Sequence, residues 1–192
     1  MLTVNNKIFL FVGASGTGKS TCMKYLSENY NILCEELSAR PFLKQNQGSY
    51  DQHMTDEIQL KIMYNNTLTI LQKLIDLNSK ENKSIVYSRS PIDVLAYMLT
   101  LNKALFLKEQ QIKFINYLRN KVIWLYIPIE FQMQEVSDSL RGMNENVRYK
   151  TDDNIVRLLG ECNIPYYTIH GNMKKRESIL DEIMIQYKIN KK

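Results

Sequence analysis

The stretch FVGASGTGKST, residues 11–21, follows an apolar run and precedes a helical pattern. Gly13, Gly18, Lys19 and Ser20 fit the spacing G-x-x-x-x-G-K-[S/T] of a phosphate-binding loop, the P-loop. Glycine lets backbone N–H groups curl around phosphate oxygens, and the positive end of the following helix points at the same anion. The stretch therefore predicts a strand, a P-loop and a helix in succession.

The P-loop predicts a nucleoside triphosphate site. Lys19 is expected to neutralise the β- and γ-phosphates, and the Ser20 hydroxyl is expected to hold Mg²⁺. We therefore expect ATP and Mg²⁺ as cofactors. The residues of this stretch expected to bind ATP are Gly13, Ala14, Ser15, Gly16, Thr17, Gly18, Lys19, Ser20 and Thr21.

Length and composition favour a single domain over residues 1–192. No apolar run approaches the roughly 20 residues of a membrane span, and the N-terminus lacks the pattern of a signal peptide, so we expect a cytoplasmic protein without a membrane partner.

The net charge of +5 weakly favours an anionic partner. The basic cluster KKRE, residues 174–177, is expected to be a solvated helix face, so nucleic acid is not the expected partner, although it is not excluded. The three cysteines have no spacing for zinc or a disulfide framework, and we expect free thiols.

Apolar runs alternate with helical patterns along the chain, which predicts an α/β protein with a P-loop NTPase fold. We expect a five-stranded parallel sheet with helices on both faces and a helical lid, and ligands at the carboxyl ends of the strands. Acidic residues at 56–57 and 152–153 are expected to open two of the helices. The predicted strands are 7–12, 30–36, 84–87, 122–127 and 166–169, and the predicted helices are 19–28, 55–77, 91–101, 105–119, 130–139, 151–161 and 174–187.

Two features of other P-loop classes are missing. Motor and sensor ATPases usually carry a second apolar strand that ends in Asp, whereas the strand SIVYS ends at Ser88. The Asn-Lys-x-Asp motif of GTPases is also absent. Both absences favour small-molecule phosphotransferases.

The stretch IVYSRSPIDVLAY, residues 85–97, resembles the Asp-Arg-x-x-x-[Ser/Asp]-x-x-Ala-Tyr segment of thymidylate-kinase-like nucleotide kinases. It is also similar to the P-loop kinases that include nicotinamide riboside kinase and phage nucleotide kinases. The resemblance implies that Arg89 contacts substrate or the transferring phosphate, and that Asp93 and Tyr97 belong to the acceptor site. Ser88 stands where the family usually has Asp, so support of the metal is expected to pass to Glu35 or Glu36.

Further acceptor contacts are expected after the second strand. The stretch CEELSARPF, residues 34–42, resembles the Glu-x-x-Arg region of the same family. By that resemblance Glu36 contacts or deprotonates the acceptor and Arg40 binds its anionic group; the alternative is that both are surface charges. Gln59 is a candidate contact to the acceptor base.

A lid is expected at about residues 130–150, where NENVRYKTDD resembles the lid sequence of these kinases. Arg141 and Arg148 are expected to close over the transferring phosphoryl group and exclude water, unless they are exposed arginines without a catalytic part. The resemblance also places adenine near the Gly171 loop.

These observations predict an enzyme, an ATP-dependent kinase of a small-molecule nucleotide acceptor. A deoxynucleoside monophosphate such as dTMP is the first acceptor hypothesis. The alternatives are a hydroxyl acceptor (a nucleoside, nicotinamide riboside or a polynucleotide 5′ end), with Glu36 as the base, and a nucleotide-binding switch or ATPase. The thymidylate kinase resemblance also suggests a homodimer.

Overall fold

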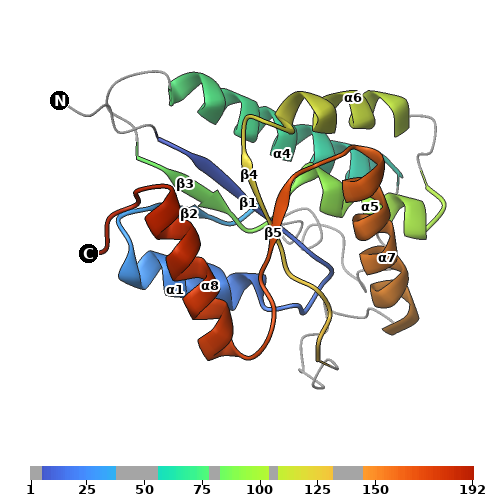
Figure 1. Ribbon diagram of the computed structural model, residues 1–192. Helices are drawn as coiled ribbons and strands as arrows, with labels where there is room; N and C mark the ends of the chain where they lie inside the picture. Colours follow the sequence, from blue (N-terminus) through green and yellow to red (C-terminus); the bar gives the residue numbers. More distant parts are fainter. Residues whose placement is uncertain (1–5, 38–55, 78–82, 104–107, 132–144) are drawn as a thin grey trace.

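A computed structural model describes residues 6–37, 56–77, 83–103, 108–131 and 145–192. Within these residues five strands form one parallel sheet in the order β2-β3-β1-β4-β5 (Figure 1). The predicted α/β architecture and its five strands are confirmed. Their bounds are β1 Ile8–Val12, β2 Leu33–Glu35, β3 Ile85–Tyr87, β4 Ile123–Tyr126 and β5 Tyr166–Thr168.

The central strand β1 sets the position of the P-loop. It pairs with β3 on one side, with Leu10 opposite Tyr87, and with β4 on the other, with Val12 opposite Tyr126. Because all these strands are parallel, their carboxyl ends share one edge. The residues that follow β1, β3 and β4 therefore meet there.

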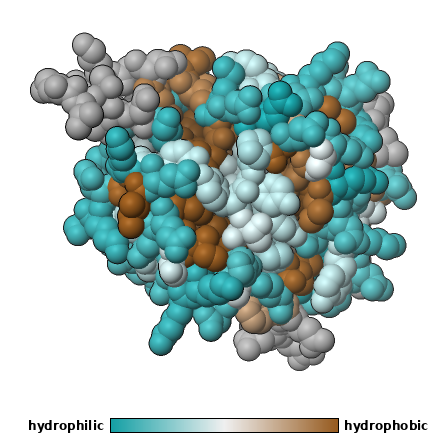
Figure 2. All heavy atoms as spheres, in the orientation of Figure 1, coloured by the Kyte–Doolittle hydropathy of each residue, from teal (hydrophilic) through white to brown (hydrophobic). Residues whose placement is uncertain are grey.

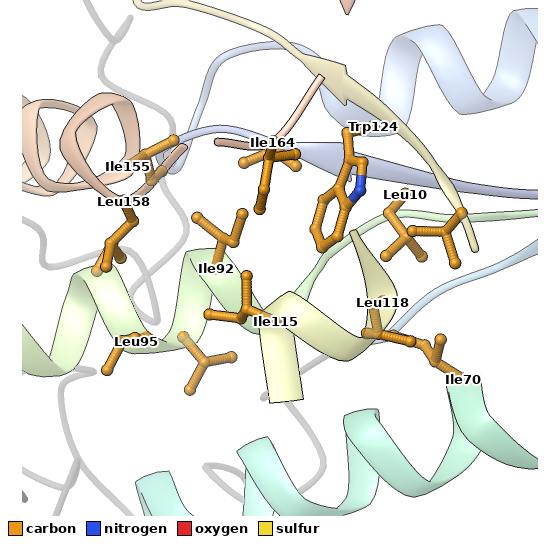
Figure 3. Packing of buried hydrophobic residues seen from close by; sticks show 14 of the residues in the cluster. Leu10, Ile70, Ile92, Leu95, Ile115, Leu118, Trp124, Ile155, Leu158 and Ile164 are labelled. Carbon is orange, nitrogen blue, oxygen red and sulfur yellow. The ribbon is translucent and has the colours of Figure 1, made fainter. Parts of the chain in front are cut away.

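Helices cover both faces of the sheet (Figure 1). On one face lie α1 and α8, which share a buried cluster with Phe9 and Phe11 of β1. On the other face lie α4, α5, α6 and α7, packed over a cluster that contains Leu10 and Trp124 (Figure 3). Their bounds are α1 Lys19–Asn29, α4 Asp56–Asp76, α5 Pro91–Thr100, α6 Lys108–Leu118, α7 Glu145–Glu161 and α8 Met173–Gln186.

The continuous apolar runs are explained by this two-sided cover. Every residue of β1, β3 and β4 is buried, whereas β2 and β5, at the two edges of the sheet, keep exposed residues. Strands with helices on both faces have no solvated side, so they lose the alternation of polar and apolar residues.

Helix α7 differs from its prediction. It begins at Glu145, six residues before the predicted start at residue 151, so Asp152 lies inside the helix and does not open it. The segment 145–159 contains neither glycine nor proline, and nothing in it interrupts a helix. Of the helix predicted at 130–139, Glu130 and Phe131 are not helical, and the rest lies outside the described residues.

The surface seen in Figure 2 is largely hydrophilic, with its apolar residues in separate patches. Among the helices that the structure describes, none combines the length and the apolar character needed to cross a membrane.

Candidate functional site

The P-loop connects the end of β1 to the start of α1. Gly16 and Gly18 have the left-handed backbone conformation, with φ of 71° and 97°. Lys19 is buried, and its Nζ atom lies 2.6 Å from the carbonyl oxygen of Ala14 and 2.5 Å from that of Gly13. The lysine therefore folds back into its own loop.

Asp93 ties the P-loop to helix α5. Its Oδ1 atom accepts a hydrogen bond of 2.8 Å from the Gly13 N–H, and its Oδ2 atom accepts bonds from the N–H and the hydroxyl of Ser90. Ser90 and Asp93 form a capping box at the start of α5. Sequence reasoning placed Asp93 at the acceptor, whereas the structure places both carboxylate oxygens on these groups.

Gly13 also lies too close to β4 to carry a side chain. A Cβ atom there would be 2.5 Å from the carbonyl oxygen of Ile127. The first glycine of the motif therefore allows the P-loop to pass next to the residue that follows β4.

Arg148 reaches the P-loop from helix α7. It is fully buried, and its Nε atom donates to the carbonyl oxygen of Ser15 at 2.8 Å. The same guanidinium donates to the Phe131 carbonyl at 2.9 Å and pairs with Glu145 at 3.1 Å. The structure thus brings this predicted lid arginine to the donor site, as a buried residue of α7.

Arg176 reaches the P-loop from α8, so the expectation of a solvated KKRE face holds for Lys174 and Lys175, which are exposed, but is wrong for Arg176. Only 4% of Arg176 is exposed, and its Nη1 atom lies 2.5 Å from the carbonyl oxygen of Thr17. A Cβ atom on Gly18 would be 2.7 Å from that Nη1, so Gly18 makes room for the arginine. A signal was present in the sequence, because residue 176 has helical spacing with the buried Leu180 and Ile183.

Several charged side chains gather around Lys19. Burial lowers the pKa of Lys19 to about 8; Asp93 and Asp152 act to raise it, while Arg89 and Arg148 act to lower it. The predicted residues Lys19, Arg89, Asp93 and Arg148 are therefore close enough to interact electrostatically at the carboxyl edge.

Asp152 is a member of this group that sequence reasoning assigned to a helix start. Its Oδ2 atom accepts a hydrogen bond of 2.9 Å from the Tyr126 hydroxyl, at the end of β4. Burial raises the pKa of Asp152, although hydrogen bonds from the Tyr126 hydroxyl and the Ile129 backbone act to lower it. Asp152 lies four residues after Arg148, which puts the two residues on the same side of a helix. This spacing indicates that Asp152 faces the P-loop only when the helix is known to begin before Arg148.

Ser88 has a role within the protein. It is buried, and its hydroxyl accepts a hydrogen bond of 3.1 Å from the Leu37 N–H, which joins the ends of β2 and β3. Of the two acids proposed to compensate for Ser88, Glu35 hydrogen-bonds to the Tyr87 hydroxyl, and burial together with Glu35 raises the pKa of that tyrosine. Glu36 follows β2 and is exposed.

The other acceptor candidates are only partly described. Gln59 on α4 and Tyr97 on α5 are both buried. Arg40 and Arg141 lie outside the described residues, as do residues 132–144 of the predicted lid, while 145–150 form the start of α7.

The described residues contain no group of three His, Cys, Asp or Glu side chains that could hold a metal by themselves. Ser20 is exposed in the first turn of α1, directly after Lys19. A hydroxyl oxygen completed by phosphate oxygens and water suits the octahedral oxygen preference of Mg²⁺. Ser20 therefore fits the predicted magnesium role, whereas the hydroxyl of Ser88 already accepts a hydrogen bond from the backbone.

Comparison with known proteins identifies a family. Residues 8–176 match the family described as an AAA domain. No curated protein sequence matches the chain.

Solved structures share the fold at low identity. The NadR protein in complex with NR is 18% identical, with a TM-score of 0.74, over 98% of this chain and 53% of that one. Deoxyadenosine kinase from M. mycoides is 14% identical, with a TM-score of 0.63, over 94% of this chain and 99% of that one. Thymidylate kinase from Ehrlichia chaffeensis is 17% identical, with a TM-score of 0.59, over 95% of this chain and 99% of that one. The chain thus spans about half the length of the NadR protein.

Proposed function

We propose that this chain, which belongs to the AAA-domain family, is an ATP-dependent phosphotransferase acting on a nucleoside or nucleotide. One observation carries the proposal: a P-loop lysine lies within electrostatic range of Arg89 and Arg148 at the carboxyl edge of a parallel sheet. Phosphoryl transfer needs little covalent chemistry from the protein and mainly requires positioning and cations around the moving group.

Each residue has a role in this scheme. Lys19 leaves the Gly13 and Ala14 carbonyls and binds the β- and γ-phosphates, while the P-loop amides hold their oxygens. Ser20 would hold Mg²⁺, which neutralises charge on the triphosphate when it is bound. Arg89 and the lid residue Arg141 stabilise the charge that develops on the transferring phosphoryl group, and Arg148 joins them once its guanidinium leaves the Ser15 and Phe131 carbonyls. Gly171 belongs to the loop proposed to lie next to adenine.

The first acceptor hypothesis is a deoxynucleoside monophosphate such as dTMP. An acceptor phosphate is already ionised and needs cations, and Arg40 would supply them. Gln59 and Tyr97 are the proposed contacts to the rest of the acceptor.

A hydroxyl acceptor is the second candidate, and a specific observation favours it. Glu36 follows β2 at the carboxyl edge of the sheet and is exposed, so it is accessible to a substrate hydroxyl. Among structures of similar fold, NadR is seen in complex with NR, whereas deoxyadenosine kinase is seen with both dCMP and dCDP as products, so the second structure does not separate the two acceptor classes. Glu36 would then be the general base.

We further propose that the chain is a single domain, works in the cytoplasm and forms a homodimer. Size-exclusion chromatography with light scattering tests the last point, since a mass of about twice 22.6 kDa is expected.

The test of the function is ADP formation from ATP and Mg²⁺ with a panel of acceptors. The panel contains deoxynucleoside and ribonucleoside monophosphates, nucleosides, nicotinamide riboside, 5′-hydroxyl DNA and a tube without acceptor. We expect turnover that requires one acceptor, with the phosphorylated product identified by mass spectrometry. Lys19→Ala should lower that turnover roughly 100-fold or more. ADP formed equally without any acceptor would overturn the kinase proposal in favour of an ATPase or switch.

Substitution at Glu36 separates the two acceptor classes. Glu36→Gln should abolish transfer to a hydroxyl but leave transfer to a monophosphate largely intact. Glu28→Gln, at an exposed position on α1, is the matched control. Full activity of Glu36→Gln with a hydroxyl acceptor would exclude Glu36 as the base.

A further inference from the structure

We infer that Arg176 is a positioning residue, which holds the P-loop in its anion-binding form and links it to the turns that follow β4 and β5. The inference rests on the proposed function, because it concerns the donor site of the same reaction.

The guanidinium of Arg176 donates in three directions. Nη1 donates to the Thr17 carbonyl, Nε donates to the Gly171 carbonyl at 2.9 Å, and Nη2 pairs with Glu130 at 2.8 Å. Only 5% of the side chain is exposed. A planar fork of N–H donors is needed to satisfy three acceptors from three segments, which a lysine could not do with the same geometry.

Glu130 closes the network on the other side. Both of its carboxylate oxygens accept from the Gly171 N–H, at 2.8 and 2.7 Å. Burial acts to raise the pKa of Glu130, but the hydrogen bonds from Arg176 and Gly171 outweigh it and hold the pKa below its usual value. Glu130 is therefore anionic at neutral pH, and Arg176 has a charged partner within the protein.

The turn at residues 130–131 is connected to the P-loop twice. Arg176 joins Glu130 to Thr17, and Arg148 joins the Phe131 carbonyl to that of Ser15. The Arg176 guanidinium carbon also lies 5.5 Å from the centre of the Phe131 ring. Arg176 is thus one of two arginines that bind carbonyl oxygens of the P-loop and link them to residues 130–131.

The geometry of the peptide bond explains the effect of the hydrogen bond between Arg176 and the Thr17 carbonyl. The Thr17 carbonyl and the Gly18 N–H belong to one peptide plane, and in a trans peptide they point in opposite directions. The structure has no cis peptide bonds among its described residues. Once Arg176 holds the Thr17 carbonyl, the Gly18 N–H is turned to the other side, away from the arginine. Arg176 therefore orients an amide that the P-loop motif uses for phosphate, without itself occupying the phosphate position.

A test must separate two roles of Arg176: orientation of the P-loop and contact with the adenine base of ATP. We would measure Kd by isothermal titration calorimetry for an imido analogue of ATP and for inorganic tripolyphosphate, which lacks a base, both with Mg²⁺. The variants are Arg176→Lys, Glu130→Gln and the control Arg157→Lys. Arg157 is an exposed arginine on α7, paired with Glu161 at 3.6 Å.

We expect Arg176→Lys to weaken both ligands by a similar factor, roughly tenfold, because one orienting hydrogen bond to the P-loop is lost. In turnover assays KM for ATP should rise with little change in kcat, and Arg157→Lys should change neither ligand. If Arg176→Lys fails to fold, judged by urea unfolding, Glu130→Gln carries the test with a smaller loss for the same two ligands.

Weakening of the ATP analogue alone would overturn the inference, because it would place Arg176 at the base. Unchanged binding of both ligands would overturn it as well and leave Arg176 a structural residue. Failure of the unsubstituted protein to bind either ligand is a different outcome, which removes the proposed function together with this inference.

Discussion

Arg148 and Arg176 lie on different helices, yet their guanidinium groups donate to the carbonyl oxygens of Ser15 and Thr17, two residues apart in the P-loop. Both arginines are almost fully buried, and each also binds the turn at residues 130–131. Lys19 bonds to the carbonyls of Gly13 and Ala14 in the same loop. Three cationic side chains thus hold carbonyl oxygens of the P-loop.

The two glycines Gly18 and Gly160 should respond to alanine in opposite ways. At Gly18 a Cβ would be 2.7 Å from Arg176 and φ is 97°, so Gly18→Ala should lower the free energy of unfolding by about 1–3 kcal/mol. At Gly160, in α7, an added Cβ would have no described atom within 4 Å outside its own stretch of helix, so Gly160→Ala should raise the free energy of unfolding by about 0.5–1 kcal/mol. Urea unfolding of both variants measures the difference, and a neutral Gly18→Ala would contradict the contact with Arg176.

Asp93→Asn should destabilise the protein. The amide cannot accept at both positions, so either the Gly13 N–H or the Ser90 donors lose their acceptor, at a cost of about 2 kcal/mol. KM for ATP should rise as well, because Gly13 opens the P-loop. The exposed Asp153 on α7 is the matched control, and Asp153→Asn should change the stability by less than about 0.5 kcal/mol. Retained stability with lost acceptor binding would instead support the acceptor role expected from the sequence.

Ser88→Ala should reduce stability and leave the metal requirement unchanged. The Leu37 N–H loses its acceptor in a buried place, which costs about 1 kcal/mol. The Mg²⁺ concentration at half-maximal turnover should stay the same, whereas Ser20→Ala should raise it. A shift of the Mg²⁺ dependence in Ser88→Ala would show that Ser88 supports the metal after all.

Lys19 makes the stability of the nucleotide-free protein depend on pH. Its pKa falls from 10.5 to about 8 because it is buried, so between these values the unfolded chain binds more protons than the folded protein. The free energy of unfolding of the unsubstituted protein, relative to Lys19→Met, should therefore rise by about 2 kcal/mol as the pH increases from 7 to 10.

Lys19→Met also removes the hydrogen bonds of Lys19, which changes the free energy of unfolding at every pH. The pH dependence of the difference between the two proteins is therefore the quantity to measure. Denaturant titrations of both proteins at several pH values provide it. A difference that is constant or decreases with pH would mean that Lys19 keeps its ordinary pKa. Saturation with the ATP analogue should abolish the rise, because phosphate stabilises the charged lysine.

Much of the fold and the donor loop could be predicted from the sequence, because their signals are local. Strands β1, β3 and β4 are short apolar runs without alternation, and their burial on both faces follows directly from that pattern. The spacing of Gly13, Gly18 and Lys19 predicts the backbone conformation of the P-loop. The start of α7 was missed because residues 145–150 resemble a lid sequence, although nothing in the segment 145–159 interrupts a helix.

The packing of distant helices against the sheet, which no local pattern encodes, determines which side chains complete the P-loop. Arg176 is separated from Thr17 by 159 positions, and the helical period of α8 alone does not say which surface it faces. Asp93 matched a family motif, but its partner Gly13 became visible only when the first turn of α5 was placed next to the residue that follows β1. The physical reason is that conformational preferences and binding motifs act between neighbours in sequence. A buried arginine or carboxylate is tolerated only where packing brings together enough acceptors or donors to replace water.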